Sequence, residues 1–127
     1  MADPILIGIC VVEDTGKFLV GERGAQSELP GLAEFPGGKV QAGEDPCQTA
    51  LRECLEETGL KVDVVGQYPT CLQLYEHGLM ELYFFQCRPR QPGQQPAAPF
   101  HWVSRQQLAE LTFPAANREL LDWLLSS

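Results

Sequence analysis

The chain has 127 residues, 44% of them hydrophobic, with a formal net charge of −8 and a pI near 4.6. This length suits one domain with a buried core, spanning residues 1–127, and is too short for two. The acidic balance argues against nucleic acid polymers and anionic membranes as partners, because phosphate surfaces are bound by clustered lysines and arginines.

The cysteines and the N-terminus predict a cytoplasmic protein. Five cysteines form an odd, scattered set without the paired spacing of zinc or redox sites, as expected for reduced thiols. The first residues are too short and poorly flanked for a signal peptide, and no apolar run approaches the roughly 20 residues of a membrane span. Nothing in the pattern indicates an oligomeric state.

The N-terminal third predicts two strands followed by loops. Residues 5–12 are β-branched and apolar, as in a strand buried on both faces, and residues 13–16 form a turn. Residues 17–22 return as a second strand, and 24–32 form a loop that could border a pocket. The stretch 35–39, Phe-Pro-Gly-Gly-Lys, is a glycine-rich turn whose backbone can approach a ligand closely.

A helix is expected from Pro46 to Thr58. Asp45 can cap its first turn, Gln48 completes a capping box, and Gly59 suits the left-handed C-terminal cap. At helical period, one stripe can face a core; it consists of Cys47, Ala50, Leu51, Cys54 and Thr58.

Glu53, Glu56 and Glu57 stand together off this stripe, in the last turns of the helix. At this spacing like charges repel, and each carboxylate meets the negative end of the helix dipole. A solvated acidic face is one interpretation. The other is a divalent cation that compensates the charge, and oxygen-only ligands favour Mg²⁺ or Mn²⁺.

The spacing of fixed residues across this stretch resembles the signature of the Nudix hydrolases. The matching positions are Gly38, Glu44, Arg52, Glu53, Glu56, Glu57, Gly59 and apolar Leu60, and the one departure is Cys54, where the family has a larger aliphatic residue. The resemblance implies an α/β/α sandwich with a mixed β-sheet. It also implies hydrolysis of a nucleoside diphosphate linked to another group, with a divalent metal.

The rest of the chain reads as strands, loops and two helices. Residues 71–75 and 79–87 look like a hairpin whose turn, with exposed His77, could lie at the substrate mouth. Ser104 caps a helix that ends at Leu111, and an apolar stripe with Leu120 and Leu124 predicts a last helix. Further expected elements are a strand at 62–65 ended by Gly66, a loop at 88–99 and a strand at 100–103.

The tail from Phe113 to Asn117 is similar to the Phe-Pro-Pro-Ala-Asn segment of MutT-type 8-oxo-dGTP diphosphatases, with Ala115 in place of the second proline. In those enzymes the asparagine hydrogen-bonds the oxidised guanine, and an amide can do so because it is both donor and acceptor. The alternative interpretation is that Asn117 caps the last helix. Arg23 matches an arginine that reaches the nucleotide in MutT-like enzymes, or is an exposed strand-end residue.

The resemblance implies a role for each candidate site residue. Glu53 and Glu57, with the Gly37 carbonyl, would bind the first metal, Glu56 would hold metal through water or a second ion, and Arg52 would orient a glutamate. Glu44 would support the loop. The substrate would be a small nucleoside triphosphate, and its contacts would be Arg23, Phe35, Gly38, Lys39 and Asn117.

Two questions stay open at the level of sequence. The loop before the last strand lacks the acidic residue that MutT-like enzymes often carry there, so the general base is a helix glutamate or one of Glu34, Glu76 and Glu81. The function that the resemblance implies is that of a MutT-like triphosphatase, which would sanitise the nucleotide pool by releasing pyrophosphate and a monophosphate. The alternatives are a pyrophosphatase for another nucleotide, such as CTP, a modified pyrimidine triphosphate or ADP-ribose, and a catalytically silent nucleotide sensor.

Overall fold

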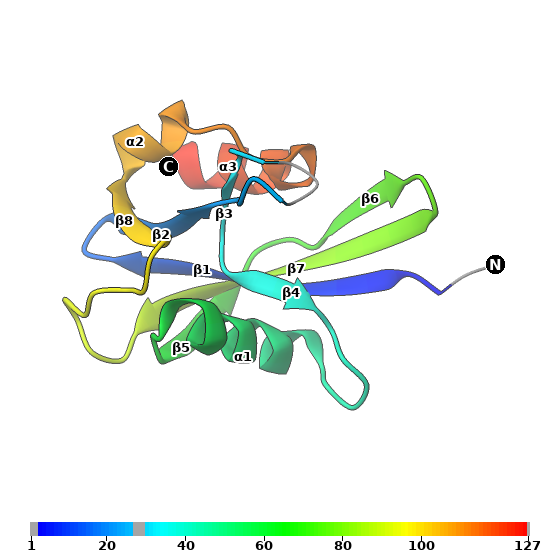
Figure 1. Ribbon diagram of the computed structural model, residues 1–127, viewed down its shortest axis with the longest axis horizontal. Coiled ribbons are helices and arrows are strands. Elements are labelled where there is room, and N and C mark those ends of the chain that lie inside the picture. The colour runs from blue at the N-terminus through cyan, green and yellow to red at the C-terminus, as the bar shows by residue number, and fades with distance from the viewer. Residues whose placement is uncertain (1–2, 27–29, 127) are drawn as a thin grey trace.

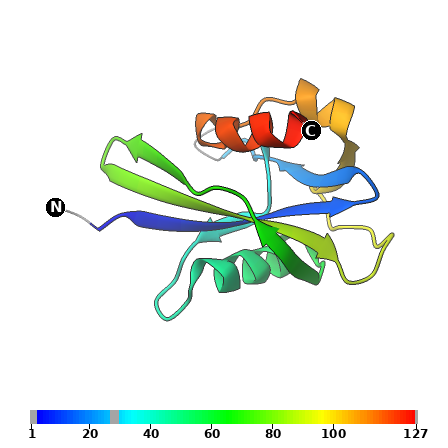
Figure 2. The same ribbon diagram turned by 180° about the vertical axis from the view of Figure 1, so that it is seen from behind.

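The computed structural model describes residues 3–26 and 30–126. In this part of the chain, an eight-stranded sheet is covered on both faces by helices (Figures 1 and 2). Helix α1 (Pro46–Thr58) lies on one face, and α2 (Arg105–Glu110) and α3 (Arg118–Leu125) lie on the other. The predicted α/β/α sandwich is confirmed.

The sheet is mixed. Five strands are hydrogen-bonded in the order β3-β2-β1-β7-β5. In addition, β4 pairs with β1, β6 pairs with β7, and β8 pairs with β2. Strands β1 and β7 pair in parallel, and the other pairs are antiparallel. The strands are β1 (Ile5–Asp14), β2 (Lys17–Glu22), β3 (Ala33–Glu34), β4 (Gly37–Lys39), β5 (Val62–Gln67), β6 (Cys71–Tyr75), β7 (Gly78–Pro89) and β8 (His101–Ser104).

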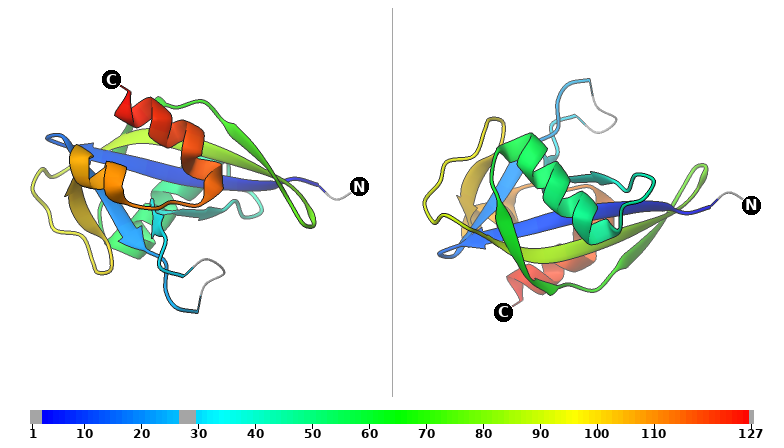
Figure 3. Two further views of the ribbon diagram at one scale, coloured as in Figure 1. Left: turned by 90° about the horizontal axis from the view of Figure 1, so that it is seen from above. Right: turned by 90° about the horizontal axis from the view of Figure 1, so that it is seen from below.

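Strand β1 is central because its side chains enter both cores. Ile9 and Val11 belong to the core beneath α2 and α3, whereas Cys10 and Val12 belong to the core beneath α1. Figure 3 shows α3, at the red end of the chain, over one face of the sheet and α1, in green, over the other. The expected burial on both faces therefore holds from Gly8 to Val12, while residues 5–7 are only half-buried.

Helix α1 begins and ends as predicted. The Asp45 side chain accepts a hydrogen bond from the Gln48 N–H, and the Gln48 side chain accepts one from the Asp45 N–H at 2.9 Å. At the other end, Gly59 adopts the left-handed conformation with φ of 78° and donates to the Leu55 carbonyl.

Gly8 allows α1 to approach the sheet closely. A Cβ atom at this position would collide with the carbonyl oxygen of Pro46, in the first turn of α1. On the same strand, β4 pairs with β1 so that Gly38 lies opposite Gly8 and Gly37 opposite Ile9. The glycine-rich segment and the glutamate helix are thus held against the same part of β1.

Several boundaries differ from the sequence prediction. Residues 37–39 are a short strand rather than a turn, because they find a partner in β1. Gly66 does not end β5; the register shifts between Val64 and Gly66 and the strand continues to Gln67. Strand β7 extends to Pro89, and β8 starts one residue later than expected.

Two further differences are that β1 continues to Asp14, into the turn predicted at 13–16, and that the short strand β3 was not predicted. Other predicted features are confirmed. Ser104 and Gln107 form the expected capping box of α2, and His77 is exposed in the β6–β7 turn. The loop predicted at 24–32 includes residues 27–29, which lie outside the described residues. No helix in the described ranges is long and apolar enough to cross a membrane.

Candidate active site

The C-terminal half of α1 presents its carboxylates to β4. The Gly37 N–H donates to Glu57 Oε1 at 2.9 Å, and the Cα of Gly38 lies so close to the Glu53 carboxylate that a Cβ there would overlap it. Both glycines are therefore in contact with glutamates of the helix. Gly37 makes this contact through its N–H, whereas the predicted metal ligand is its carbonyl.

Arg52 ties the glutamates together. Its Nε and Nη2 donate to the two oxygens of Glu44, at 2.6 and 3.0 Å. Its Nη1 donates to Glu53 at 2.7 Å and to Glu56 at 3.2 Å. A planar guanidinium that grips one carboxylate with two bonds leaves its third nitrogen in a set direction. The geometry thus agrees with the expectation that Arg52 orients a glutamate.

Glu44 also supports the loop before the helix, as expected. Its Oε1 accepts from the Gln41 N–H at 3.2 Å and from the Thr49 hydroxyl at 2.8 Å. The hydrogen bonds from Arg52, above all, lower the pKa of the Glu44 carboxyl to about 2.

Glu57 has the opposite electrostatic environment. Burial raises the pKa of its carboxyl to about 7, and the charges of Glu53, Glu34 and Glu56 act in the same direction; the Gly37 N–H opposes the shift. Burial also raises the pKa of Glu34, while Arg23 counteracts it. Perturbed carboxylates gathered in this way are typical of functional sites.

A cavity of about 430 Å³ opens next to these glutamates. Seven residues named from the sequence line it: Arg23, Glu34, Phe35, Gly37, Gly38, Lys39 and Asn117. Of these, Glu34 was expected only as a possible base. Pro114 and Ala116, close to Asn117 in the chain, also line the cavity. The structure therefore brings every predicted substrate contact to one cavity.

Asn117 occupies the N-cap position of α3, but its side chain does not cap the helix. Its side chain makes no capping bond to α3, and Nδ2 instead donates to the Pro114 carbonyl at 3.3 Å. The residue lies in the 3₁₀ turn η1 (Ala115–Asn117) and is buried, with 8% of its surface exposed. Asn117 thus stands at the start of α3 without a side-chain capping bond, and it also lines the cavity.

Part of the lining was missed by sequence reasoning. Ile7 and Ile9 of β1 and Met80 and Leu82 of β7 form an apolar part of the wall. They come together because β1 and β7 pair in parallel, with Ile7 opposite Leu82 and Ile5 opposite Met80. The alternation of side chains along each strand indicated which residues share a face of that strand. It did not indicate that β1 pairs with β7. The strand, rather than the expected hairpin turn, borders the cavity.

Comparison with known proteins decides the family. Residues 4–124 match the family model of the NUDIX domain. The chain belongs to the Nudix hydrolases. Its MutT-like character follows from a relative in Haemophilus influenzae, an 8-oxo-dGTP diphosphatase that is 33% identical over 113 residues, covering 87% of this chain and 83% of that protein.

Other relatives of this Nudix hydrolase carry different names. A CTP pyrophosphohydrolase of Escherichia coli is 45% identical over 58 residues, which cover 46% of this chain and 42% of that protein. The solution structure of the E. coli ORF135 protein superposes with a TM-score of 0.80 at 25% identity, covering 98% of this chain and 90% of that one. The chain is thus a Nudix pyrophosphohydrolase that acts on a small nucleotide.

Nudix hydrolases generally use divalent metals, and the donor set fits such an ion. Glu53 and Glu57 offer oxygens only. Burial, above all, raises the pKa of Glu57, and the charges of neighbouring glutamates add to the shift, so a cation would stabilise the ionised carboxylate. In residues 3–26 and 30–126, no three acidic, cysteine or histidine side chains are grouped closely enough to hold a metal ion. The Glu53 and Glu56 carboxylates accept hydrogen bonds from Arg52.

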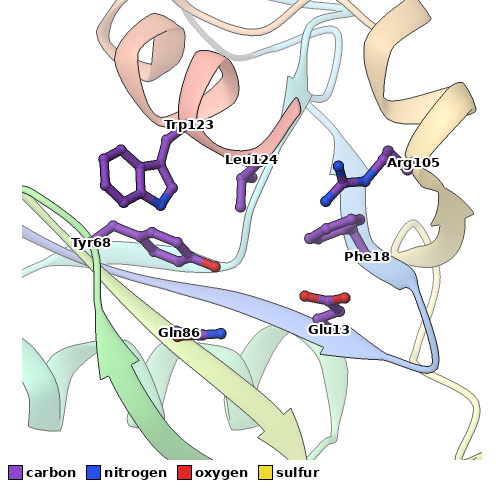
Figure 4. A pocket seen from close by; sticks show the side chains of 7 residues that line it. All are labelled: Glu13, Phe18, Tyr68, Gln86, Arg105, Trp123 and Leu124. Carbon is purple, nitrogen blue, oxygen red and sulfur yellow. The ribbon is translucent and has the colours of Figure 1, made fainter. Parts of the chain in front are cut away.

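A second, smaller pocket lies on the α3 side of the sheet (Figure 4). It is lined by Glu13, Phe18, Tyr68, Gln86, Arg105, Trp123 and Leu124. None of these residues belongs to the signature or to the lining of the larger cavity. The candidate active site of this Nudix hydrolase is therefore the cavity beside the glutamates of α1.

Proposed function

We propose that this Nudix hydrolase is a Mg²⁺-dependent nucleoside triphosphate pyrophosphohydrolase that prefers 8-oxo-dGTP and acts as one domain in the cytoplasm. Water attack would convert the triphosphate into a monophosphate and pyrophosphate. The observation that carries this proposal is the position of Asn117, whose buried amide lines the same cavity as Arg23 and Phe35. Mn²⁺ would serve as an alternative cation.

The nucleotide contacts follow from the lining. The Arg23 Nε is buried and has no hydrogen-bond partner in the part of the chain that the structure describes, so an oxygen of the nucleotide would satisfy it. Phe35 stacks on Phe113 with ring centroids 4.8 Å apart, which holds its ring in the wall. Lys39 at the exposed rim would approach the phosphates.

Asn117 would read the base. Its Nδ2 donates one hydrogen bond to Pro114, which leaves the second N–H and the carbonyl oxygen for a ligand. A paired donor and acceptor matches the edge of an oxidised purine, and a good bidentate contact of this kind contributes about 1–3 kcal/mol of discrimination.

The hydrolytic centre would consist of the glutamates. Glu53 and Glu57, with the Gly37 carbonyl, would hold one ion, and Glu56, which is the more exposed, would hold metal through water or a second ion. Bound divalent ions neutralise phosphate oxygens and make water more acidic. Arg52 would keep Glu53 in place. Among the three bases from outside the helix, Glu34 lines the cavity, so the base would be Glu34 or a glutamate of α1.

The observation that favours a second function is the similarity to the CTP pyrophosphohydrolase, which at 45% exceeds the identity to the 8-oxo-dGTP diphosphatase, although over a shorter segment. A pyrimidine triphosphate is therefore the second candidate substrate. A silent sensor is disfavoured because all signature glutamates are present in a chain of a hydrolase family.

The test is pyrophosphate release with Mg²⁺ on 8-oxo-dGTP, dGTP, dCTP, CTP and ADP-ribose, measured as kcat/KM. We expect 8-oxo-dGTP to lead. Asn117→Ala should lower kcat/KM for 8-oxo-dGTP by about 5- to 150-fold, the equivalent of the bidentate contact. Arg118→Ala, at the exposed neighbouring position, is the matched control. A wild-type preference for CTP, or an Asn117→Ala variant with unchanged selectivity, would refute base reading by Asn117.

A further inference from the structure

Thr49 is a fully buried polar residue of α1 that the proposed chemistry does not use. Its hydroxyl lies 2.8 Å from Glu44 Oε1 and 3.2 Å from the carbonyl of Asp45, one helical turn earlier. A hydroxyl has one proton to donate. It goes to Glu44, since this oxygen is nearer and carries the charge of an ionised carboxylate.

The Thr49 hydroxyl completes the set of donors around Glu44. Oε1 accepts from Thr49, from the Gln41 N–H at 3.2 Å and from Arg52 Nη2 at 3.0 Å, whereas Oε2 accepts from Arg52 Nε at 2.6 Å. Thr49 is the fully buried donor of this set, whereas Gln41 is exposed and the Arg52 side chain is 25% exposed. It therefore defines the rotation of the Glu44 carboxylate.

The orientation of Glu44 is passed on by a rigid group. The Arg52 guanidinium is planar, so the edge that binds Glu44 determines where Nη1 points. That nitrogen donates to Glu53 Oε1 at 2.7 Å, and the Glu53 side chain is 21% exposed. A continuous chain of hydrogen bonds thus leads from Thr49 through Glu44 and Arg52 to Glu53.

We propose that Thr49 is a positioning residue for Glu53, acting through Glu44 and Arg52. This inference rests on the proposed function in one respect, namely the role of Glu53 at the hydrolytic centre. Without the hydroxyl, Glu44 keeps its charge and its partner Arg52 but loses its fully buried donor. The guanidinium then tilts and Glu53 occupies its position for less of the time. The nucleotide contacts lie elsewhere in the cavity and remain.

The experiment compares four proteins: wild type, Thr49→Val, Thr49→Ser and Thr58→Val. Valine keeps the shape of threonine without the hydroxyl, and serine restores it. Thr58 is the matched control, because it is an equally buried threonine of α1 whose hydroxyl bonds the backbone, donating to the Cys54 carbonyl at 2.7 Å and accepting from the Leu60 N–H at 3.1 Å. The measurements are kcat, KM, the melting temperature, and the Kd of Mn²⁺ without nucleotide by electron paramagnetic resonance.

We expect Thr49→Val to lower kcat and weaken Mn²⁺ binding, each by about 10-fold, the lower end for residues that support metal ligands. KM should change by less than about twofold, because the ground-state contacts are untouched. Thr49→Ser should recover most of both losses. Thr58→Val should lower the melting temperature while kcat and Mn²⁺ binding stay within about twofold of wild type.

The proposal is overturned if Thr49→Val matches wild type in kcat and Mn²⁺ affinity, or if Thr58→Val loses kcat and Mn²⁺ affinity to the same extent. If wild type hydrolyses no nucleotide, the proposed function fails and the Mn²⁺ titration alone tests the role of Thr49. That role is refuted if wild type and Thr49→Val bind Mn²⁺ with equal affinity, or if neither protein binds Mn²⁺. Thr49→Ala replaces the valine variant in the same comparisons should that protein not fold.

Discussion

The replacement Gly38→Ala tests how closely β4 and the glutamate helix are packed. The added methyl group would overlap the Oε2 and Cδ atoms of Glu53, with Cγ at 3.1 Å, so the three nearest atoms all belong to one side chain. Gly38 does not have a positive φ, so alanine is compatible with its backbone conformation. The substitution therefore acts on the Glu53 carboxylate and spares the fold.

The structure provides the size of both effects. An ordinary contact requires a separation of at least 3.4 Å, so the carboxylate has to move by about 1 Å, and a displacement of this size in an active site costs about 100-fold in rate. The free energy of unfolding should stay within about 1 kcal/mol of wild type. The reason is that alanine restricts the unfolded chain by about 0.4–1 kcal/mol, which offsets the loss of the partly buried Arg52–Glu53 ion pair.

The assay is kcat for pyrophosphate release together with urea unfolding. Gly24→Ala is the matched control, because a methyl group there meets no atom of the described residues within 4 Å and the φ is not positive. Gly37→Ala is the contrasting variant, since its methyl would lie 2.6 Å from the Gly8 carbonyl oxygen, which is backbone and cannot turn away. We expect Gly37→Ala to lose stability as well as activity. A Gly38→Ala protein with wild-type kcat, or one as unstable as Gly37→Ala, would refute the reasoning.

Three further predictions follow from single contacts. Gly8→Ala should destabilise the protein by about 1–3 kcal/mol in urea unfolding, because its methyl collides with the Pro46 carbonyl; unchanged stability would contradict the position of α1. Glu57 has a pKa raised to about 7, so the stability it contributes is complete below about pH 4.5 and is lost as pH rises through 7. In EDTA, Glu57→Gln should therefore gain stability over wild type between pH 5 and pH 8, by about 1–2 kcal/mol after solvent screening, and a pH-independent difference in melting temperature would count against it. Arg52→Lys keeps the positive charge but loses the planar guanidinium that binds Glu44 through two nitrogens, so kcat should fall by about 10-fold or more with unchanged circular dichroism. A lysine variant with wild-type kcat would show that this two-nitrogen contact is unnecessary.

Local signals in the sequence predicted α1 and its ends. Asp45, Gln48 and Gly59 act within one or two turns of the helix, so their effect does not depend on the rest of the chain. The clustering of Glu53, Glu56 and Glu57 at the negative end of the helix dipole likewise predicted a metal site, and this remains a proposal. The helix, its caps and the acidic cluster could all be predicted because they depend on neighbours in sequence.

The interpretation of Asn117 shows where such signals end. A helix does follow it, and its residue type favours capping. The choice between capping α3 and lining the cavity depends on how η1 meets the apolar wall, and this involves residues far away in the chain. Local preference is worth about 1 kcal/mol and was outweighed by tertiary packing.

The sequence by itself determined the acidic helix, the glycine-rich segment before it and the Nudix character of the chain, because each depends on residue types at short spacing. Tertiary structure alone decided which residues share the cavity. The parallel pairing of β1 with β7 brings Ile7 and Ile9 beside Met80 and Leu82, and the close approach that Gly8 allows sets Glu53 and Glu57 against β4. These contacts join segments that are distant in sequence, and the free energy that selects them comes from burying both faces of one sheet.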